Sequence, residues 1–239
     1  MKVIIIAGGL GTRISEETED KPKPMVLINN KPIIWHLMNI FCLQGLNEFI
    51  ISTGYKSEII ESWVQDNIIL DSNQNKMQIK TVNTGLHTQT GGRISEIMKI
   101  LPGEKVIATY GDGLANVSMK KLLHFHTSHG KLATVTAVRP PARFGYMRIN
   151  NNEVTHFGEK NQSDEGWING GFFILDSKVS NYVKSVSEPF ESGALVKLSN
   201  ESQLMAYHHK GFWQPMDTLR EKRDLEKSAK LSIPPWLEI

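Results

Sequence analysis

The sequence lacks most of the features that mark secreted, membrane-bound or nucleic-acid-binding proteins. It holds a single cysteine, Cys42, which excludes an intramolecular disulfide and a cysteine-based zinc cluster and fits a reducing compartment. The apolar run from Val3 to Ala7 is too short for the core of a signal peptide and far too short to cross a bilayer. A formal net charge of +2 gives no electrostatic case for binding nucleic acid. These absences predict a cytoplasmic protein with no membrane or nucleic-acid partner.

The sequence also lacks an internal repeat, a low-complexity segment and a Pro/Gly/Ser-rich linker, so we expect a single domain over residues 1–239. Buried β-branched runs alternate with stretches of helical apolar spacing. We expect strands at 3–6, 48–53, 76–82, 106–110 and 131–138, and helices at about 33–44, 56–66, 92–101 and 119–129. This alternation predicts an α/β layered fold with a mainly parallel sheet.

The regular alternation of expected strands and helices ends at about Arg139. Short strand-like pieces at 146–149, 154–159 and 170–175 are split by turn residues, and a helix is expected near 177–185. We interpret this half as an extension of the same sheet that carries a lid.

A glycine-rich loop, Gly8-Gly9-Leu10-Gly11-Thr12-Arg13, directly follows the first expected strand. Open parallel sheets bind ligands beyond the carboxyl ends of their strands, and glycines there let backbone N–H groups approach phosphate oxygens. The loop has no Gly-Lys-Ser/Thr and is not a P-loop, and Ile14 stands where the dinucleotide fingerprint has its third glycine. Taken alone, the loop is more often an ordinary turn without a ligand than a phosphate-binding loop.

Two lysines alternate with two prolines in the segment from Lys21 to Met25. Each proline fixes its own φ and biases the preceding residue away from helix, so we expect an extended segment. In an extended chain Lys21 and Lys23 would lie on one side. A solvated basic loop is the alternative interpretation, and the glycine-rich loop upstream favours a phosphate-binding role.

Together these two segments resemble the sugar-1-phosphate nucleotidyltransferases, the nucleotide-sugar pyrophosphorylases. Further segments fit the cytidylyl branch of that family, namely SEET at 15–18, TGGR at 90–93, YGDG at 110–113, INGGFF at 168–173 and GFWQPMDTLR at 211–220. The similarity covers nearly the whole chain. It implies a Rossmann-like open, mainly parallel mixed sheet with helices on both faces and a small sugar-binding lid subdomain. Residues 1–138 would then form the nucleotide-binding core, and residues 139–239 the sugar-binding and metal-binding half.

The reaction that the resemblance implies joins CTP to α-D-glucose 1-phosphate and yields CDP-glucose and pyrophosphate, with Mg²⁺ as cofactor. Its implied role is nucleotide-sugar synthesis for surface polysaccharide such as lipopolysaccharide O-antigen. The attacking sugar-phosphate oxygen is already an anion, because the second pKa of a phosphate monoester is about 6. No general base is needed, which agrees with the absence of a G-x-S-x-G nucleophile elbow. The barrier is mostly electrostatic, so cations and a metal should dominate the site.

The resemblance assigns four charged residues to this chemistry. Arg13 would hold the triphosphate, and Lys23 would lie near the phosphate of the sugar phosphate and the α-phosphate. Asp112 and Asp217 would bind Mg²⁺, which prefers one or two carboxylates completed by phosphates and water. Taken alone, Asp112 also fits a turn position before Gly113, and Asp217 fits a helix N-cap or first turn.

The remaining implied contacts fall into two groups. The nucleotide-binding group consists of Ala7, Gly8, Gly9, Gly11, Thr12, Arg13, Thr88, Thr90, Gly92, Arg93 and Gly111. The sugar-phosphate-binding group consists of Lys23, Gly145, Glu159, Lys160, Asn169 and Gly170, with Arg143 and Phe144 near the same pocket. Without the resemblance, the TGGR segment is an N-cap and turn ahead of a helix.

The sequence departs from the family pattern at two places. Asn161 follows Glu159-Lys160 where the family usually has proline, and the segment between Val64 and Thr84 is shorter and less basic than in cytidylyltransferases. In that family the second region helps to cover the nucleotide and to build subunit contacts. We expect a homo-oligomer, while its subunit number and the strictness of base choice stay open.

Two alternatives to the implied function are kept. One retains the chemistry with dTTP or UTP, or with another hexose or heptose 1-phosphate. The other is a non-catalytic sensor or regulatory subunit that binds a sugar nucleotide. The joint presence of Arg13, Lys23, Asp112 and Asp217 argues against it.

A metal site at His124, His126 and His129 is not expected, because no acidic or cysteine partner is near in sequence. Trp213 is expected to pack in the core and position Asp217.

Overall fold

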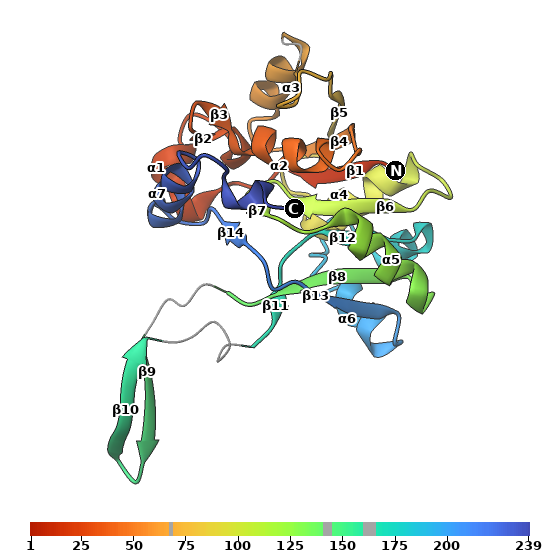
Figure 1. The fold of residues 1–239 in the computed structure, drawn as a ribbon. Coiled ribbons are helices and arrows are strands. Elements are labelled where there is room, and N and C mark those ends of the chain that lie inside the picture. The colour runs from red at the N-terminus through yellow and green to blue at the C-terminus, as the bar shows by residue number, and fades with distance from the viewer. Residues whose placement is uncertain (67–68, 141–144, 160–165) are drawn as a thin grey trace.

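The computed structural model describes residues 1–66, 69–140, 145–159 and 166–239 (Figure 1). One sheet of eight strands runs through it in the order β11-β8-β12-β6-β1-β4-β5, with β13 also paired to β8. These strands are β1 (Val3–Ile6), β4 (Glu48–Thr53), β5 (Gln78–Asn83), β6 (Val106–Tyr110), β8 (Ala133–Val138), β11 (Ile168–Asn169), β12 (Phe173–Leu175) and β13 (Leu204–His208). Strands β5, β4, β1 and β6 are mutually parallel, as are β8 and β13, whereas β12 and β11 pair antiparallel. The predicted α/β fold with a mainly parallel, mixed sheet is confirmed.

Helices cover both faces of this sheet. The longer ones are α2 (Ile33–Cys42), α3 (Ser57–Gln65), α4 (Thr90–Lys99), α5 (Met119–His129), α6 (Ala194–Asn200) and α7 (Leu219–Ser228). Side chains of β1 alternate between two cores: Val3 and Ile5 pack with α2, α5 and α7, while Ile4 and Ile6 pack with α4 and α6. Both faces of the central strands are therefore buried, which explains their continuous β-branched sequences. No helix in the described ranges is long and apolar enough to cross a membrane.

Turn and capping residues set several element boundaries where they were expected. Gly45 adopts a left-handed φ of 81° just after α2, and the N–H of Leu46 donates to the carbonyl of Phe41. Helix α5 begins at Ser118, whose side chain accepts from the N–H of Lys121, and ends at Gly130 with a φ of 63°. Strands β4 and β6 and helix α5 match their predicted ranges.

The second half of the chain differs from the prediction in several elements. The expected strand at 170–175 is shortened to β12 at its end, because Gly171 and Phe172 have left-handed φ values of 77° and 47°, and the short strand β11 lies just before it. The expected helix at 177–185 is a shorter 3-10 helix, Ser177–Tyr182, that ends where Val183 turns extended. The prediction also missed two short paired strands, β7 (Gly113–Ala115) and β14 (Trp213–Pro215), and helices α6 and α7.

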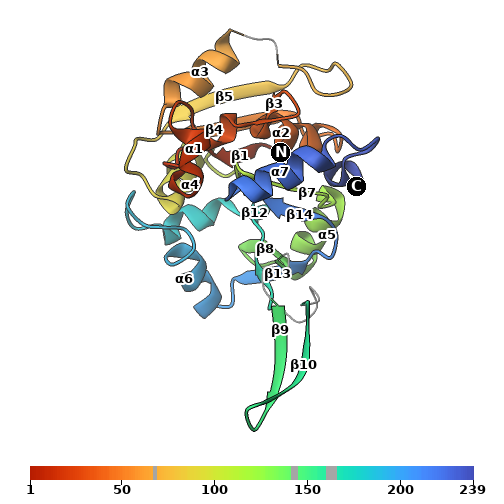
Figure 2. The same ribbon diagram turned by 90° about the vertical axis from the view of Figure 1, so that its left-hand side faces the viewer.

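Strands β9 (Gly145–Asn150) and β10 (Glu153–Glu159) form a separate two-stranded sheet. Asn151 and Asn152 connect them with φ values of 45° and 70°, as a tight turn with two left-handed residues requires. The hairpin projects away from the main sheet in both views (Figures 1 and 2). Of the second half, β11, β12 and β13 extend the main sheet as expected, and the β9–β10 hairpin is a separate addition to it.

Two histidines share one hydroxyl beneath α5. His126 Nδ1 and His129 Nε2 lie 2.9 Å and 2.8 Å from Thr134 Oγ1, and the N–H of Lys131 donates to His129 Nδ1 at 2.9 Å. His129 therefore donates to the hydroxyl, and the hydroxyl donates to His126. Burial, followed by the charges of Lys105 and His129, lowers the pKa of His126 to about 4. Burial also lowers the pKa of His129.

The lowered pKa of His126 makes the free energy of unfolding depend on pH. Between about pH 6.5 and 4 the unfolded chain binds a proton at His126 that the folded chain does not, so the free energy of unfolding decreases as pH drops through that window. We expect His126 alone to contribute a loss of about 3 kcal/mol. Urea unfolding at several pH values measures this. His126→Gln should flatten the dependence, whereas His124→Gln at an exposed position of the same helix should not. A slope that is unchanged in His126→Gln would contradict the assignment.

Candidate active site

A cavity of about 910 Å³ opens at the carboxyl ends of β1 and β6. The glycine-rich loop after β1 and residues 110–113 after β6 form part of its wall, and the start of α4 and parts of β11 and β14 form the rest. Ligands of open α/β sheets bind at this edge. The cavity thus lies where the sequence predicts the site.

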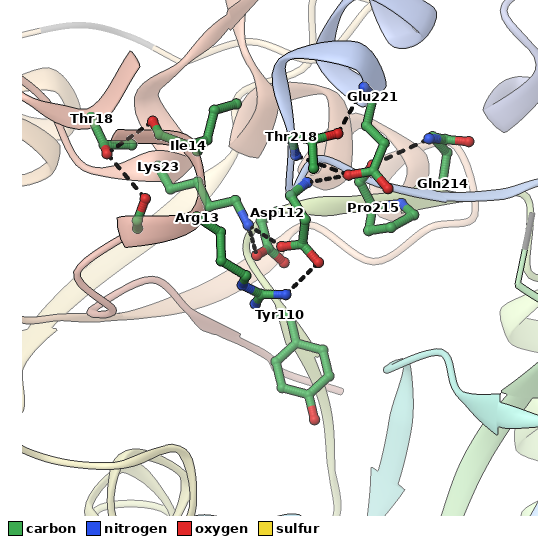
Figure 3. A network of polar contacts seen from close by, with 12 residues as sticks. Arg13, Ile14, Thr18, Lys23, Tyr110, Asp112, Gln214, Pro215, Thr218 and Glu221 are labelled. Carbon is green, nitrogen blue, oxygen red and sulfur yellow. Dashed lines mark hydrogen bonds and ion pairs between the residues drawn. The ribbon is translucent and has the colours of Figure 1, made fainter. Parts of the chain in front are cut away.

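Four charged side chains meet at one end of the cavity (Figure 3). Lys23 Nζ donates to Asp112 Oδ2 at 2.7 Å and to Asp217 Oδ1 at 2.6 Å. Arg13 Nη1 donates to the other oxygen of Asp217 at 2.5 Å. Lys23 and Asp217 are 194 residues apart in the sequence. The fold therefore brings together all four residues that the resemblance assigns to catalysis and metal binding.

The start of α7 holds Asp217 in place. Glu221 Oε2 accepts from the backbone N–H groups of Asp217 at 2.7 Å and Thr218 at 2.9 Å. The Thr218 side chain in turn accepts from the N–H of Glu221, which completes a capping box. Asp217 therefore precedes the N-cap, and the Glu221 carboxylate that takes part in the cap also fixes the backbone of Asp217.

Asp112 follows β6 and is tied to the segment that carries Asp217. The N–H of Met216 donates to the carbonyl of Asp112 at 2.8 Å, and Gly113 pairs with Pro215 in the β7–β14 ladder. Trp213, on β14, packs against the core and donates its indole N–H to the carbonyl of Gly170 at 2.9 Å. The antiparallel β7–β14 pair thus holds Asp112 and Asp217 beside the ammonium group of Lys23.

Lys23 reaches the aspartates from a 3-10 turn, Lys23–Met25. The N–H of Met25 bonds to the carbonyl of Pro22 at 2.8 Å, so the chain curls at Lys23 and is extended only before it. The expected alternation along one extended segment is therefore wrong from Lys23 onward. Lys23 is buried and lines the cavity, whereas Lys21 is half-buried and is not part of its described wall.

Arg93 lies underneath the glycine-rich loop. Its guanidinium donates to the carbonyls of Thr53 at 2.8 Å and Gly8 at 2.9 Å and to Thr84 Oγ1 at 2.7 Å. The side chain is 2% exposed, and burial lowers its pKa. A Cβ at Gly8 would lie 2.0 Å from the guanidinium, so only glycine fits there. Arg93 thus braces the loop and places a positive charge directly beneath it.

A second polar network lies on the same cavity wall. Tyr110 Oη donates to Glu191 Oε1 at 2.5 Å, and Thr90 Oγ1 donates to Glu191 Oε2 at 2.7 Å. Asn169 Nδ2 donates to Tyr110 Oη at 2.9 Å. Sequence reasoning missed Tyr110 and Glu191. The position of Tyr110 next to Gly111 is a signal that could have found it, while Glu191 lies in an irregular segment without one.

Most of the other predicted site residues line the cavity. The nucleotide group does so at Ala7, Gly8, Gly9, Gly11, Thr12, Thr88, Thr90, Arg93 and Gly111, and the sugar-phosphate group does so at Asn169 and Gly170. Gly92 instead packs within α4, where a Cβ would lie 2.3 Å from the carbonyl of Val186. Gly145 pairs with Glu159 at one end of the β9–β10 hairpin. Lys160, Arg143 and Phe144 lie outside the described residues.

The two aspartates fit a divalent cation. Their oxygens come from the middle of the chain and from near its C-terminus, and they converge on one positively charged atom, the ammonium nitrogen of Lys23. Two carboxylates with room for phosphate oxygens and water match the ligands of Mg²⁺. An open α/β sheet with a glycine loop, two basic side chains and two aspartates at its ligand-binding edge is a site for phosphoryl chemistry on a nucleotide.

Comparisons with known proteins agree with this class of site. The family model described as "Nucleotidyl transferase" matches residues 2–218. The chain is 41% identical to glucose-1-phosphate cytidylyltransferase of Salmonella typhimurium, over 99% of this chain and 98% of that protein. It is 39% identical to a probable glucose-1-phosphate cytidylyltransferase of Bacillus subtilis, over 95% of both chains.

Solved structures share the fold. HddC from Yersinia pseudotuberculosis, complexed with GMP-PN, superimposes with a TM-score of 0.72 at 26% identity, over 96% of this chain and 99% of that one. A UDP-glucose pyrophosphorylase complexed with UDP-glucose gives 0.70 at 19% identity, over 95% and 97% of the two chains, which is a likeness of fold alone. The chain belongs to the nucleotidyl transferase family. The resemblance inferred from the sequence motifs is confirmed, and the protein is a nucleotidyltransferase enzyme.

Proposed function

We propose that this enzyme transfers a cytidylyl group from CTP to α-D-glucose 1-phosphate, which yields CDP-glucose and pyrophosphate. The observation that carries the proposal is the convergence of Arg13 and Lys23 on Asp112 and Asp217 beneath the glycine-rich loop. The choice of CTP and glucose 1-phosphate is supported by the 41% identity to the Salmonella enzyme over nearly the full chain. A non-catalytic sensor would have no need for this complete set of charges.

In this proposal the protein acts mainly by placing charge. The sugar-phosphate oxygen attacks the α-phosphorus as an anion and needs no base, so the site must bring two anions together and stabilise the leaving pyrophosphate. Lys23 would move its ammonium from the aspartates to the α-phosphate and the sugar phosphate. Arg13, whose side chain is 71% exposed, would fold over the triphosphate, and Arg93 would add its charge from beneath the loop.

Asp112 and Asp217 would hold the metal, and members of the family generally use a divalent one. We propose Mg²⁺, which would neutralise phosphate charge and polarise the reacting phosphate. The capping box at Thr218 and the β7–β14 pair would keep the two carboxylates at a fixed separation while ligands exchange.

Pyrophosphate release measured with four NTPs against several sugar 1-phosphates tests the proposal directly. CTP with glucose 1-phosphate should give the highest kcat/KM, and activity should vanish with EDTA and return with Mg²⁺. Turnover with no combination would favour the sensor. The highest turnover with another sugar would keep the chemistry and change the substrate.

The choice of base is the part of this assignment that a kinetic measurement can test most sharply. Cytosine carries an exocyclic amino donor where uracil has a carbonyl, so a site acceptor facing that group is mismatched when UTP binds. The carbonyl of Gly8 is taken by Arg93 and by the N–H of Tyr55, which leaves Ala7, Gly9, Thr88 and the 89–93 segment as candidate acceptors. A mismatch of ~1–3 kcal/mol predicts that kcat/KM for CTP exceeds that for UTP by roughly 5- to 150-fold. We expect dTTP to be poor, because the pocket must also fit its methyl group.

Both values are to be measured with saturating glucose 1-phosphate, so that only the nucleotide differs. If UTP equals or surpasses CTP, the cytidylyl assignment fails, and the nucleotidyltransferase chemistry stays.

We further propose that residues 1–138 form the nucleotide-binding core and residues 139–239 the sugar-binding and metal-binding half. This division is supported by the glycine loop in the first part and by Asn169 and Asp217 in the second. We also propose that the protein is cytoplasmic, forms a homo-oligomer and supplies CDP-glucose for surface polysaccharide. Light scattering of the purified chain tests the oligomer, which a monomer at all concentrations would contradict.

A further inference from the structure

Glu191 lies in the irregular segment before α6, and its exposed side chain lines the cavity. Both of its carboxylate oxygens accept from a hydroxyl, one from Tyr110 at 2.5 Å and the other from Thr90 at 2.7 Å. Tyr110 is the last residue of β6, and Thr90 is the first residue of α4. Glu191 therefore joins two walls of the cavity.

This network also fixes the orientation of Asn169. Its Nδ2 donates to Tyr110 Oη at 2.9 Å, and its Oδ1 accepts from the N–H of Gly171 at 2.9 Å. Burial, followed by the charge of Glu191, raises the pKa of Tyr110 above its usual value, so the phenol keeps its proton and donates it to Glu191. The Asn169 amide thus donates a hydrogen bond to the Tyr110 hydroxyl, which in turn donates one to the Glu191 carboxylate. One N–H of Asn169 and lone pairs of Glu191 remain available for a ligand.

The charge of Glu191 indicates which part of a substrate it faces. None of the ion pairs found among the described residues includes Glu191. A carboxylate without a cation repels phosphate and accepts strongly from neutral hydroxyls. The basic groups Arg13 and Lys23 gather elsewhere in the cavity, and the Tyr110 hydroxyl points away from them (Figure 3). The Glu191 end therefore suits a polyhydroxylated group.

We propose that Glu191 is a specificity-determining residue for the hexose of the sugar phosphate, an inference that rests on the proposed function. Its carboxylate and the amide of Asn169 supply an acceptor and a donor, the pair that one sugar hydroxyl uses. The hexose is favoured over the ribose because Glu191 is linked through Tyr110 to Asn169 of the proposed sugar-phosphate group, whereas the glycine loop braced by Arg93 belongs to the proposed nucleotide group. Glu191 thus selects sugars with a hydroxyl at the facing carbon.

Glu191→Gln tests this, since it keeps the shape of the side chain and removes the charge. We expect KM for glucose 1-phosphate to rise roughly 10-fold, the effect of weakening one charge-assisted hydrogen bond, with kcat and KM for CTP nearly unchanged. Glu188→Gln is the matched control. Glu188 lies on the same segment and pairs with Lys197 at 2.7 Å, outside the described cavity wall, so its loss should alter Tm and not KM.

Deoxy analogues of glucose 1-phosphate identify the hydroxyl. For one analogue, the loss of kcat/KM seen with the wild type should shrink or disappear in Glu191→Gln. An unchanged KM for glucose 1-phosphate, or a rise in KM for CTP instead, would overturn the inference, the latter assigning Glu191 to the ribose. If the wild type does not use glucose 1-phosphate, the proposed function fails separately. The same comparison is then made with the sugar 1-phosphate that it does use.

Discussion

Asp217→Asn should lower kcat by at least ~10²-fold while the protein stays folded. Asp217 is the only residue in the described cluster that contacts both Arg13 and Lys23, and it is one of the two proposed metal ligands. An amide in its place removes a metal-binding charge and leaves two basic side chains with one carboxylate, Asp112. Steady-state turnover over a range of Mg²⁺ concentrations measures the loss, and the thermal unfolding midpoint reports on the fold.

Asp224→Asn is the matched control for this change. Asp224 is an exposed carboxylate on α7, the helix that Thr218 caps, so its replacement should leave kcat unaltered. Near-normal turnover of Asp217→Asn at low Mg²⁺ would remove Asp217 from the metal site.

Lys23→Ala should depress kcat/KM far more than Lys21→Ala, by an order of magnitude or more. Lys23 is buried, lines the cavity and bonds both aspartates, whereas Lys21 is half-buried and outside the described cavity wall. One charged contact is worth about 1.5–3 kcal/mol, which sets the scale of the difference. The two variants also remove the same charge from the same segment, so any effect on the long-range potential cancels in the comparison.

Lys23→Ala leaves two partly buried carboxylates, Asp112 and Asp217, without their shared cation and can therefore also lower stability. The thermal unfolding midpoint of both variants separates such a loss of stability from a loss of catalysis. Equal losses of kcat/KM in the two variants would mean that Lys23 has no special place at the reacting phosphates.

The sequence could place part of the charged cluster, because the glycine loop that carries Arg13 and the turn that carries Asp112 each follow a recognisable strand. The glycine loop follows a buried strand, Asp112 follows another, and parallel strands bring such ends to one edge. Local rules failed at the Lys-Pro repeat, where a local turn replaces the extended conformation. The extended form expected of the Lys-Pro repeat gives way at Lys23 to the turn closed by Met25.

Contacts between distant irregular segments left no local signal. Glu191 reaches Thr90 and Tyr110 across 101 and 81 residues, and nothing in the sequence around it has the spacing of a helix or strand that faces the site. The left-handed Phe172 is equally hidden, since bulky residues rarely adopt that conformation and only the surrounding sheet enforces it. Propensity and periodicity describe neighbours along the chain, and these features depend on neighbours in space.

The capping box at the start of α7 makes the completion of this site a late event in the life of the chain. Arg13 and Lys23 leave the ribosome early, and Asp217 with its bracing residue Glu221 follows about two hundred residues later. Until α7 forms, the backbone N–H groups of Asp217 and Thr218 lack the carboxylate of Glu221 that holds them, and the segment is tied only through Met216 and the β7–β14 pair. A nascent chain can therefore build its glycine loop and most of its parallel sheet long before its charges are balanced. Because Glu221 both caps α7 and binds the backbone of Asp217, the start of this helix and the position of Asp217 depend on the same side chain.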